Sequence, residues 1–76
     1  MKAYILMQIR VGSIPEVIGN LKRMDQVIEA HSILGPYDII AIVEAKDTNQ
    51  MGRLVNVDIQ VIPGVLETLT CLIVEE

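Results

Sequence analysis

The stretch ILGPYDII, residues 33–40, decides how the chain folds, because it joins two apolar runs through a Gly35-Pro36 pair. Glycine and proline are the strongest turn residues, so this pair predicts a hairpin between two strands. The second run opens with Tyr37 and Asp38. A turn needs the glycine and the proline, but it gives no reason for a carboxylate at the root of an apolar strand.

The same strand–helix–strand order is expected on both sides of this hairpin. The first helix is expected to begin at Ser13, which forms the capping-box pattern with Glu16. The second is expected to begin at Asp47 or Thr48, either of which can cap it, and to end at Pro63-Gly64. The predicted strands run from Lys2 to Arg10, from about Gln26 to Leu34, from Tyr37 to Lys46 and from Val65 to Glu75.

This β-α-β-β-α-β order predicts a ferredoxin-like α+β fold, with a four-stranded antiparallel sheet and two helices on one face. Right-handed crossovers put the first and third strands in the centre. Their central segments, Tyr4–Ile9 and Ile39–Val43, are apolar on both faces. A chain of 76 residues, of which 51% are apolar, has too small an interior to cover both faces. We therefore predict that the open face pairs with the sheet of a second copy, giving a dimeric α+β barrel.

Composition and charge exclude several classes of function. No apolar run reaches the roughly 18 residues that suggest a membrane span. The net charge is −4 and the six Lys and Arg residues are scattered, whereas nucleic-acid binding needs a clustered basic face. The single cysteine, Cys71, excludes an internal disulfide and indicates a cytoplasmic protein. With one histidine, His31, it does not make a zinc site, which needs three or four ligands.

The opening stretch carries a family resemblance. Residues 35–38, followed by alternating aliphatic residues, resemble the Gly-x-Tyr-Asp signature of the effector (RAM) domain of the leucine-responsive regulator/AsnC family. Asp47, residues 63–65, Thr68 and Thr70 fit the same pattern. The resemblance covers residues 1–76 as one domain. Family members usually carry an N-terminal helix-turn-helix domain, and nothing precedes the first strand here, so we expect a stand-alone effector domain without a DNA-binding domain.

The resemblance implies a non-enzymatic module without a cofactor. It implies a homodimer that assembles into a tetramer, octamer or larger ring and binds a free amino acid between dimers. Because a DNA-binding domain is not expected, mixed assembly with full-length regulators of the family is the hypothesis for how the module modulates amino-acid metabolism or transcription. The implied ligand contacts come from Gly35, Pro36, Tyr37, Asp38, Thr68 and Thr70.

The chemistry of these residues suits a zwitterion. A turn can aim several N–H groups at a carboxylate, and here the donors would be Gly35, Tyr37 and Asp38, since Pro36 has no N–H. The carboxylate of Asp38 can meet the ammonium group in a charge-assisted contact. The threonines, two residues apart on one strand face, offer hydroxyls.

Simpler interpretations stay open for each residue. Asp38 can accept N–H groups of its own turn, Tyr37 can pack at the sheet end, and threonine suits strands in general. The function also has alternatives. One is a small dimeric α+β barrel enzyme, an isomerase or monooxygenase, with His31 and Tyr4 or Tyr37 as its only acid–base groups. The other is a pure assembly module whose pocket has degenerated. Which amino acid binds, and the role of His31, stay open.

Overall fold

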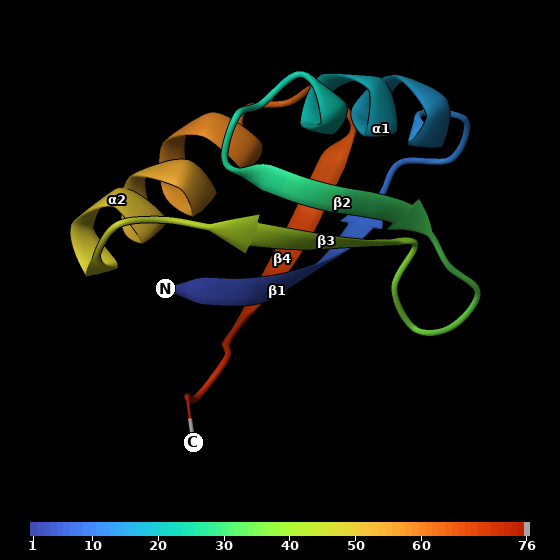
Figure 1. Cartoon of the computed structure of the whole chain (residues 1–76). Coiled ribbons are helices and arrows are strands. Elements are labelled where there is room, and N and C mark those ends of the chain that lie inside the picture. The colour runs from blue at the N-terminus through green and yellow to red at the C-terminus, as the bar shows by residue number, and fades with distance from the viewer. Residues whose placement is uncertain (76) are drawn as a thin grey trace.

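The computed structural model, which describes residues 1–75, confirms the predicted order of elements (Figure 1). Its elements are β1 (Lys2–Ile9), α1 (Ile14–Lys22), β2 (Val27–Ser32), β3 (Ile39–Glu44), α2 (Thr48–Arg53), the π-helix η1 (Leu54–Ile59) and β4 (Val65–Leu72). The four strands form one antiparallel sheet in the order β2-β3-β1-β4, with the first and third strands in the centre. This is the predicted ferredoxin-like fold.

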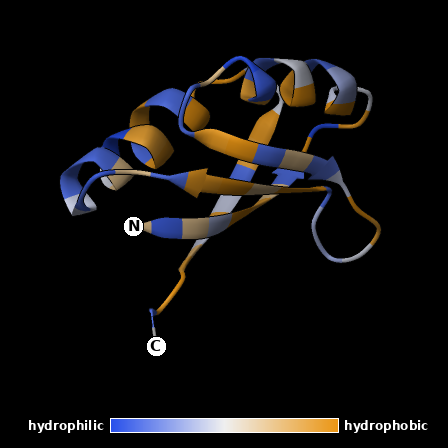
Figure 2. Ribbon diagram, in the orientation of Figure 1, coloured by the Kyte–Doolittle hydropathy of each residue, from blue (hydrophilic) through white to orange (hydrophobic). Residues whose placement is uncertain are grey.

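The core lies between the sheet and the helices. Along β1 and β3 every second side chain is buried on the helix side. Figure 2 shows β3 hydrophobic along almost its whole length, and hydrophobic and hydrophilic residues mixed along the helices. The apolar residues of both helical segments, Val17 and Leu21 among them, face this layer. Their burial removes apolar area from water and stabilises the fold. The largest side chains that are fully buried there are Ile5, Met7, Leu21, Ile39, Leu54, Ile59, Val17 and Val43.

The second helical segment differs from the prediction of one helix that ends at Pro63-Gly64. Its α-helical turns stop at Arg53, and the chain continues as η1, where the N–H of Gln60 donates to the carbonyl of Val55 at 3.2 Å. This i→i−5 spacing defines a π-helix. The wider turn keeps Leu54 and Ile59, five residues apart, on the same buried side.

The capping box predicted at the first helix is wrong. Ser13 has helix-like dihedral angles (φ −98°, ψ −3°), and its side chain makes no capping hydrogen bond. A side-chain cap needs an extended residue at this position. Asp47 has that conformation (φ −155°, ψ 179°), and its Oδ1 accepts the N–H of Gln50 at 2.8 Å. The cap predicted for the second helix is therefore confirmed.

The strands are shorter than predicted, although the hairpin is confirmed. The loop between β2 and β3 spans residues 33–38, so Tyr37 and Asp38 precede the strand that they were expected to open. The N–H of Ile33 donates to the carbonyl of Asp38 at 2.9 Å and closes the loop. Pro36 cannot donate to a strand ladder, which explains why regular pairing stops on either side of it. β1, β3 and β4 also end earlier than predicted, at Ile9, Glu44 and Leu72.

Gly64 tests how tightly the start of α1 packs against the turn before β4. Its φ is +101°, and a Cβ there would lie 2.6 Å from the Cβ of Ser13. Gly12 has a similar φ of +88°, but a Cβ there would meet nothing within 4 Å. We expect Gly64→Ala to lower the free energy of unfolding by about 2–5 kcal/mol, and Gly12→Ala by about 1–2 kcal/mol. Urea denaturation measures the free energy of unfolding of both variants. Equal losses would show that Ser13 moves away from the new methyl group without a cost in stability.

Candidate functional site

Asp38 is bound to the neighbouring strand β1 through both its main chain and its side chain. Its N–H donates to the carbonyl of Met7 at 2.8 Å, and its Oδ2 accepts the N–H of Ile9 at 2.8 Å. Nearby, the side-chain amide of Gln8 donates to the carbonyl of Pro36 at 3.3 Å. The carboxylate therefore takes the place of a strand carbonyl where the β1–β3 pairing ends. This explains an aspartate at the root of an apolar strand.

This arrangement changes which groups of the loop are free for a ligand. The N–H of Asp38 is engaged with Met7, so the prediction that it would serve a ligand carboxylate is wrong. Gly35 is exposed and Tyr37 is half-buried, and neither N–H bonds to another group within residues 1–75. The Oδ1 of Asp38 has no hydrogen-bond partner in the same part of the chain. The loop thus retains two main-chain donors and one carboxylate oxygen.

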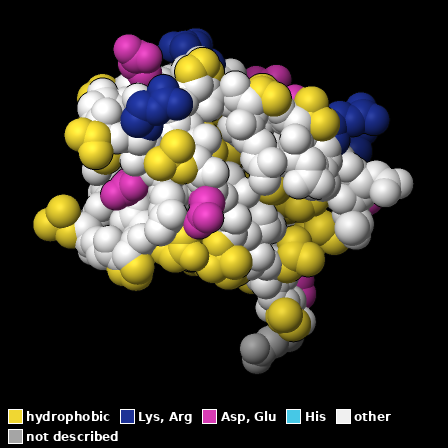
Figure 3. Space-filling view, turned by 180° about the vertical axis from the view of Figure 1, so that it is seen from behind, with side chains coloured by type: hydrophobic (Ala, Val, Ile, Leu, Met, Phe, Trp, Pro, Cys, Tyr) yellow, Lys and Arg dark blue, Asp and Glu magenta, His cyan; other side chains and the backbone are white. Residues whose placement is uncertain are grey.

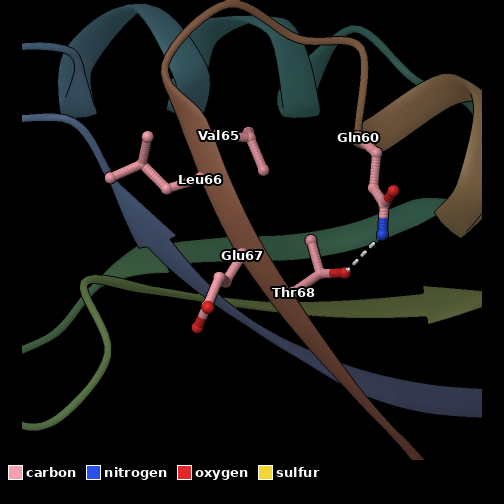
Figure 4. A pocket seen from close by; sticks show the side chains of 5 residues that line it. All are labelled: Gln60, Val65, Leu66, Glu67 and Thr68. Carbon is pink, nitrogen blue, oxygen red and sulfur yellow. Dashed lines mark hydrogen bonds between the residues drawn. The ribbon is translucent and has the colours of Figure 1, made fainter.

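Thr68 and Thr70 lie on the same face of β4, as predicted from strand alternation. They sit opposite Met7 and Ile5, whose side chains are buried, so both threonines point to the helix side of the sheet. The Oγ1 of Thr68 accepts a hydrogen bond from the Nε2 of Gln60 at 3.1 Å (Figure 4). Gln60 was missed by the sequence reasoning, because nothing in the sequence marks where a π-helix begins.

The two threonines line separate hollows. Thr68 borders a hollow of about 360 Å³ at the outer edge of β4. Thr70 borders another of about 320 Å³ between β4 and the second helical segment. The first is lined by Gln60, Val65, Leu66, Glu67 and Thr68. The second is lined by Met1, Thr48, Met51, Gly52, Val55, Asn56, Thr70 and Leu72.

Within one chain, the predicted ligand residues do not form one cavity. Residues 35–38 line neither of these hollows. Met7 pairs with Ile39 on one side and with Thr68 on the other, so the loop and Thr68 flank β1 at the same level. Two strand spacings, about 10 Å, separate the two groups.

The alternative enzyme would need acid–base groups in a cleft between the helices and the sheet. That space is filled by the apolar core. The Nε2 of His31 lies 2.8 Å from Oε1 of Glu29, and both side chains are more than half exposed. They border a hollow of about 340 Å³ along the outer edge of β2. Within residues 1–75, no three His, Cys, Asp or Glu residues are placed to hold a metal ion.

The sheet face opposite the helices is apolar and open. Figure 3 shows hydrophobic side chains gathered on the side of the molecule away from α1. Leu6 lies in the middle of this face, between Ile40 on β3 and Leu69 on β4. We call this surface the open face; its apolar members are Tyr4, Leu6, Ile40, Ile42, Leu69 and Cys71.

Comparison with known proteins identifies the class of protein to which this fold and loop belong. Residues 2–76 match the family model of the Lrp/AsnC ligand binding domain, so the chain belongs to the Lrp/AsnC family. The HTH-type transcriptional regulator FL11 of Pyrococcus abyssi (strain GE5 / Orsay) is 29% identical over 75 residues, which cover 99% of this chain and 49% of that regulator. The chain spans about half the length of the curated relatives it matches.

Solved structures share this fold. Hypothetical protein PHS023 from Pyrococcus horikoshii superposes with a TM-score of 0.91 at 31% identity, covering 99% of this chain and 90% of that one. Transcriptional regulator NMB0573 from Neisseria meningitidis, solved as an L-Met complex, gives a TM-score of 0.91 at 17% identity over 99% of this chain and 50% of that one. The second likeness concerns the fold alone. In residues 1–75 we find no helix with the length and apolar character that spanning a bilayer requires.

The bond between Asp38 and Ile9 predicts how the loop tolerates substitution. Asp38→Ala leaves a half-buried N–H without an acceptor, so we expect the free energy of unfolding to fall by about 1–3 kcal/mol. Asp38→Asn keeps an acceptor oxygen and should lose less. Asp25→Ala, at an exposed aspartate without a hydrogen bond in the described chain, serves as the control. Chemical denaturation of the three variants checks this, and wild-type stability of Asp38→Ala would mean that the bond contributes nothing.

Proposed function

We propose that the chain is a non-enzymatic regulatory module that binds a free amino acid and couples this binding to its own assembly. The observation that carries the proposal is the loop of residues 35–38 in an Lrp/AsnC ligand binding domain. This loop offers the Oδ1 of Asp38 as an acceptor and the N–H groups of Gly35 and Tyr37 as donors. An amino-acid zwitterion needs both kinds of group. A regulator of the same fold, NMB0573, has been solved with L-Met, which supports this class of ligand.

A ligand held by the loop and by β4 together would need two copies of the chain. The loop lies on the β3 side of β1 and Thr68 on the β4 side, and no hollow described above joins them. We infer that Gly35, Pro36, Tyr37 and Asp38 of one copy meet Thr68, and less directly Thr70, of another. A ligand bound across copies favours the assembled form by mass action.

The open face supplies the primary contact of the assembly. Its side chains are exposed or half-buried over three neighbouring strands, and pairing two such faces would remove their remaining apolar surface from water at roughly 25 cal/mol per Å². We propose a sheet-to-sheet dimer, with dimers joining into a tetramer or octamer through their loop ends. The amino acid would then lie between dimers.

The partners of this module are proposed to be longer regulators that contain the same domain. FL11 aligns with this chain over 49% of the length of that regulator, so it contains a related region, with which we propose that this chain forms mixed assemblies. The output would be a change in transcription or amino-acid metabolism, in the cytoplasm. With a net charge of −4, this chain would act through the partner and not by its own contact with nucleic acid.

Amino-acid binding can be tested by titrating each of the twenty amino acids calorimetrically while light scattering records the mass. We expect at least one to bind with a dissociation constant of about 1 mM or lower, and the mass to shift on binding. Asp38→Asn keeps an acceptor for Ile9 but removes the charge that would face the ammonium, so it should weaken binding about tenfold. If no amino acid produces binding heat or a change of mass, the proposal is overturned and pure assembly is left as the function.

The dimer is tested with Leu6→Glu, which puts a charge at the centre of the open face. Burying an unpaired carboxylate is costly, so sedimentation should show the variant as a folded monomer at concentrations where the wild type is a dimer or larger. Val61→Glu is the matched control, because Val61 is 69% exposed and lies outside the sheet. A Leu6→Glu protein of wild-type mass would exclude the open face as the interface.

A further inference from the structure

The segment that follows β4 extends beyond the end of the sheet. The N–H of Ile73 donates at 2.9 Å to the carbonyl of Lys2, which is the first residue of β1. Within residues 1–75 no strand lies beside the residues after Ile73. Figure 1 shows this segment leaving the body of the molecule. We call residues 73–75 the arm.

The arm has the features of a strand without a partner. Val74 is 79% exposed, and Glu75 is exposed as well. The groups that face a partner alternate along an antiparallel strand, and the N–H of Ile73 faces β1. The N–H and the carbonyl of Val74 therefore point away from β1. A β-branched residue with free main-chain groups is a template for pairing with another strand edge.

The outer edge of β2 is an edge of this kind. The N–H of Ile33 donates to the carbonyl of Asp38, so it faces the β3 side. By alternation, the main-chain groups of Ala30 and Ser32 point outward. β2 is the last strand in the order of the sheet, and the hollow of about 340 Å³ described above lies along its outer side. This edge has room for one more strand.

Charge favours the edge of β2 over the edge of β4 as the partner of the arm. The hollow at β2 is lined by Lys22, from the last turn of α1, and by Glu29, whose carboxylate is paired with His31. Among the described residues that line the hollow at the outer edge of β4, the one ionisable residue is Glu67. The carboxylate of Glu75 would therefore meet a cation at the first edge and a like charge at the second.

The direction of the strands fits an exchange between two copies. β2 is antiparallel to β3 and β3 is antiparallel to β1, so β2 runs antiparallel to β4. If two open faces meet about a two-fold axis parallel to the strands, β4 of each copy lies opposite β2 of the other and antiparallel to it. An axis across the strands would instead place β4 opposite β4, beside Glu67.

The length of the arm also fits. Two packed sheets lie about 10 Å apart, and three extended residues span about 10 Å. The arm leaves the sheet at the end where β1 begins, and β2 begins at the same end because it runs parallel to β1. Glu75 therefore arrives near the start of β2, where Lys22 lines the hollow.

We propose that the arm of one copy pairs with the outer edge of β2 in a second copy, with Glu75 beside Lys22 of that copy, and that two copies exchange their arms. This proposal rests on the sheet-to-sheet dimer proposed above. It adds the direction of the two-fold axis and a main-chain contact that joins the two sheets at both edges.

Cross-linking tests the exchange directly. A chain with Cys71→Ser, Lys22→Cys and Glu75→Cys has one thiol on each side of the proposed contact. In one chain three strand spacings, about 14 Å, separate β2 from β4, whereas a disulfide needs Cα atoms within about 7 Å. On oxidation we expect a covalent dimer on a non-reducing gel. Arg53→Cys, an exposed position on α2, replaces Lys22→Cys in the control, which should stay monomeric on the gel.

Sedimentation gives the dissociation constant of the dimer for a second set of variants, after thermal unfolding has established that each is folded. Lys22→Glu and Glu75→Lys should each weaken the dimer about twofold to fivefold, and the two together should restore it. Val74→Pro removes the outward N–H of the arm, so we expect a dimer weaker by about tenfold or more. The matched charge reversal Arg53→Glu should leave the dissociation constant unchanged.

Three results would each overturn the exchange of arms. They are a wild-type dissociation constant for Val74→Pro, a double charge reversal that is no tighter than the single ones, and a cross-linked yield equal to that of the control. The sheet-to-sheet dimer would stand in these cases, because Leu6→Glu tests it separately. A wild-type chain that stays monomeric at every concentration would overturn both proposals.

Discussion

The structure depends on β1, which lies in the centre of the sheet and contributes side chains to both of its faces. It pairs with β3 on one side and with β4 on the other. Its odd-numbered side chains are fully or nearly fully buried under the helices, and Tyr4 and Leu6 face the opposite way. A strand that is apolar on both faces needs a packing partner on each face, and within the 76-residue chain the helices pack on one face only. The open face is therefore where the fold and the proposed assembly with a second copy are connected.

Asp38 shows how a residue can serve stability and binding at once. Its Oδ2 satisfies the N–H of Ile9, where the strand ladder ends, and this bond sets the position of the whole loop. The same bond orients Oδ1, which has no hydrogen-bond partner among residues 1–75. A preorganised acceptor loses less freedom when a ligand arrives, so the structural role of Asp38 favours the proposed binding role.

Much of the fold could be predicted because it depends on local patterns. The order of elements, the central strands and the Asp47 cap follow from the apolar pattern and from turn and cap residues. The capping box at Ser13 failed because the backbone there is helical, and Ser13 packs closely against Gly64, which is 51 positions away. The π-helix also went unpredicted, since η1 matches its apolar side chains to a sheet formed by distant parts of the chain.

In the candidate site, too, local features could be predicted and features that depend on tertiary placement could not. Strand alternation was enough to place Thr68 and Thr70 on one face, and the turn residues were enough to find the loop. Three features could not be read from the sequence, because each depends on tertiary placement. The carboxylate of Asp38 binds β1, the two threonines open into different hollows, and Gln60 joins Thr68.

The π-helix has a consequence for how the length of this segment can change. A π-turn contains one residue more than an α-turn, so deleting one residue between 54 and 59 would let the segment rewind as an ordinary α-helix. Because one residue fewer at the larger rotation per residue of an α-helix covers about the same total turn, the segments on either side would stay nearly in phase. The wide turn of η1 is therefore where this segment can lose a residue without rotating the entry to β4, whereas a deletion in the α-helical turns of α2 would shift every later residue of the segment.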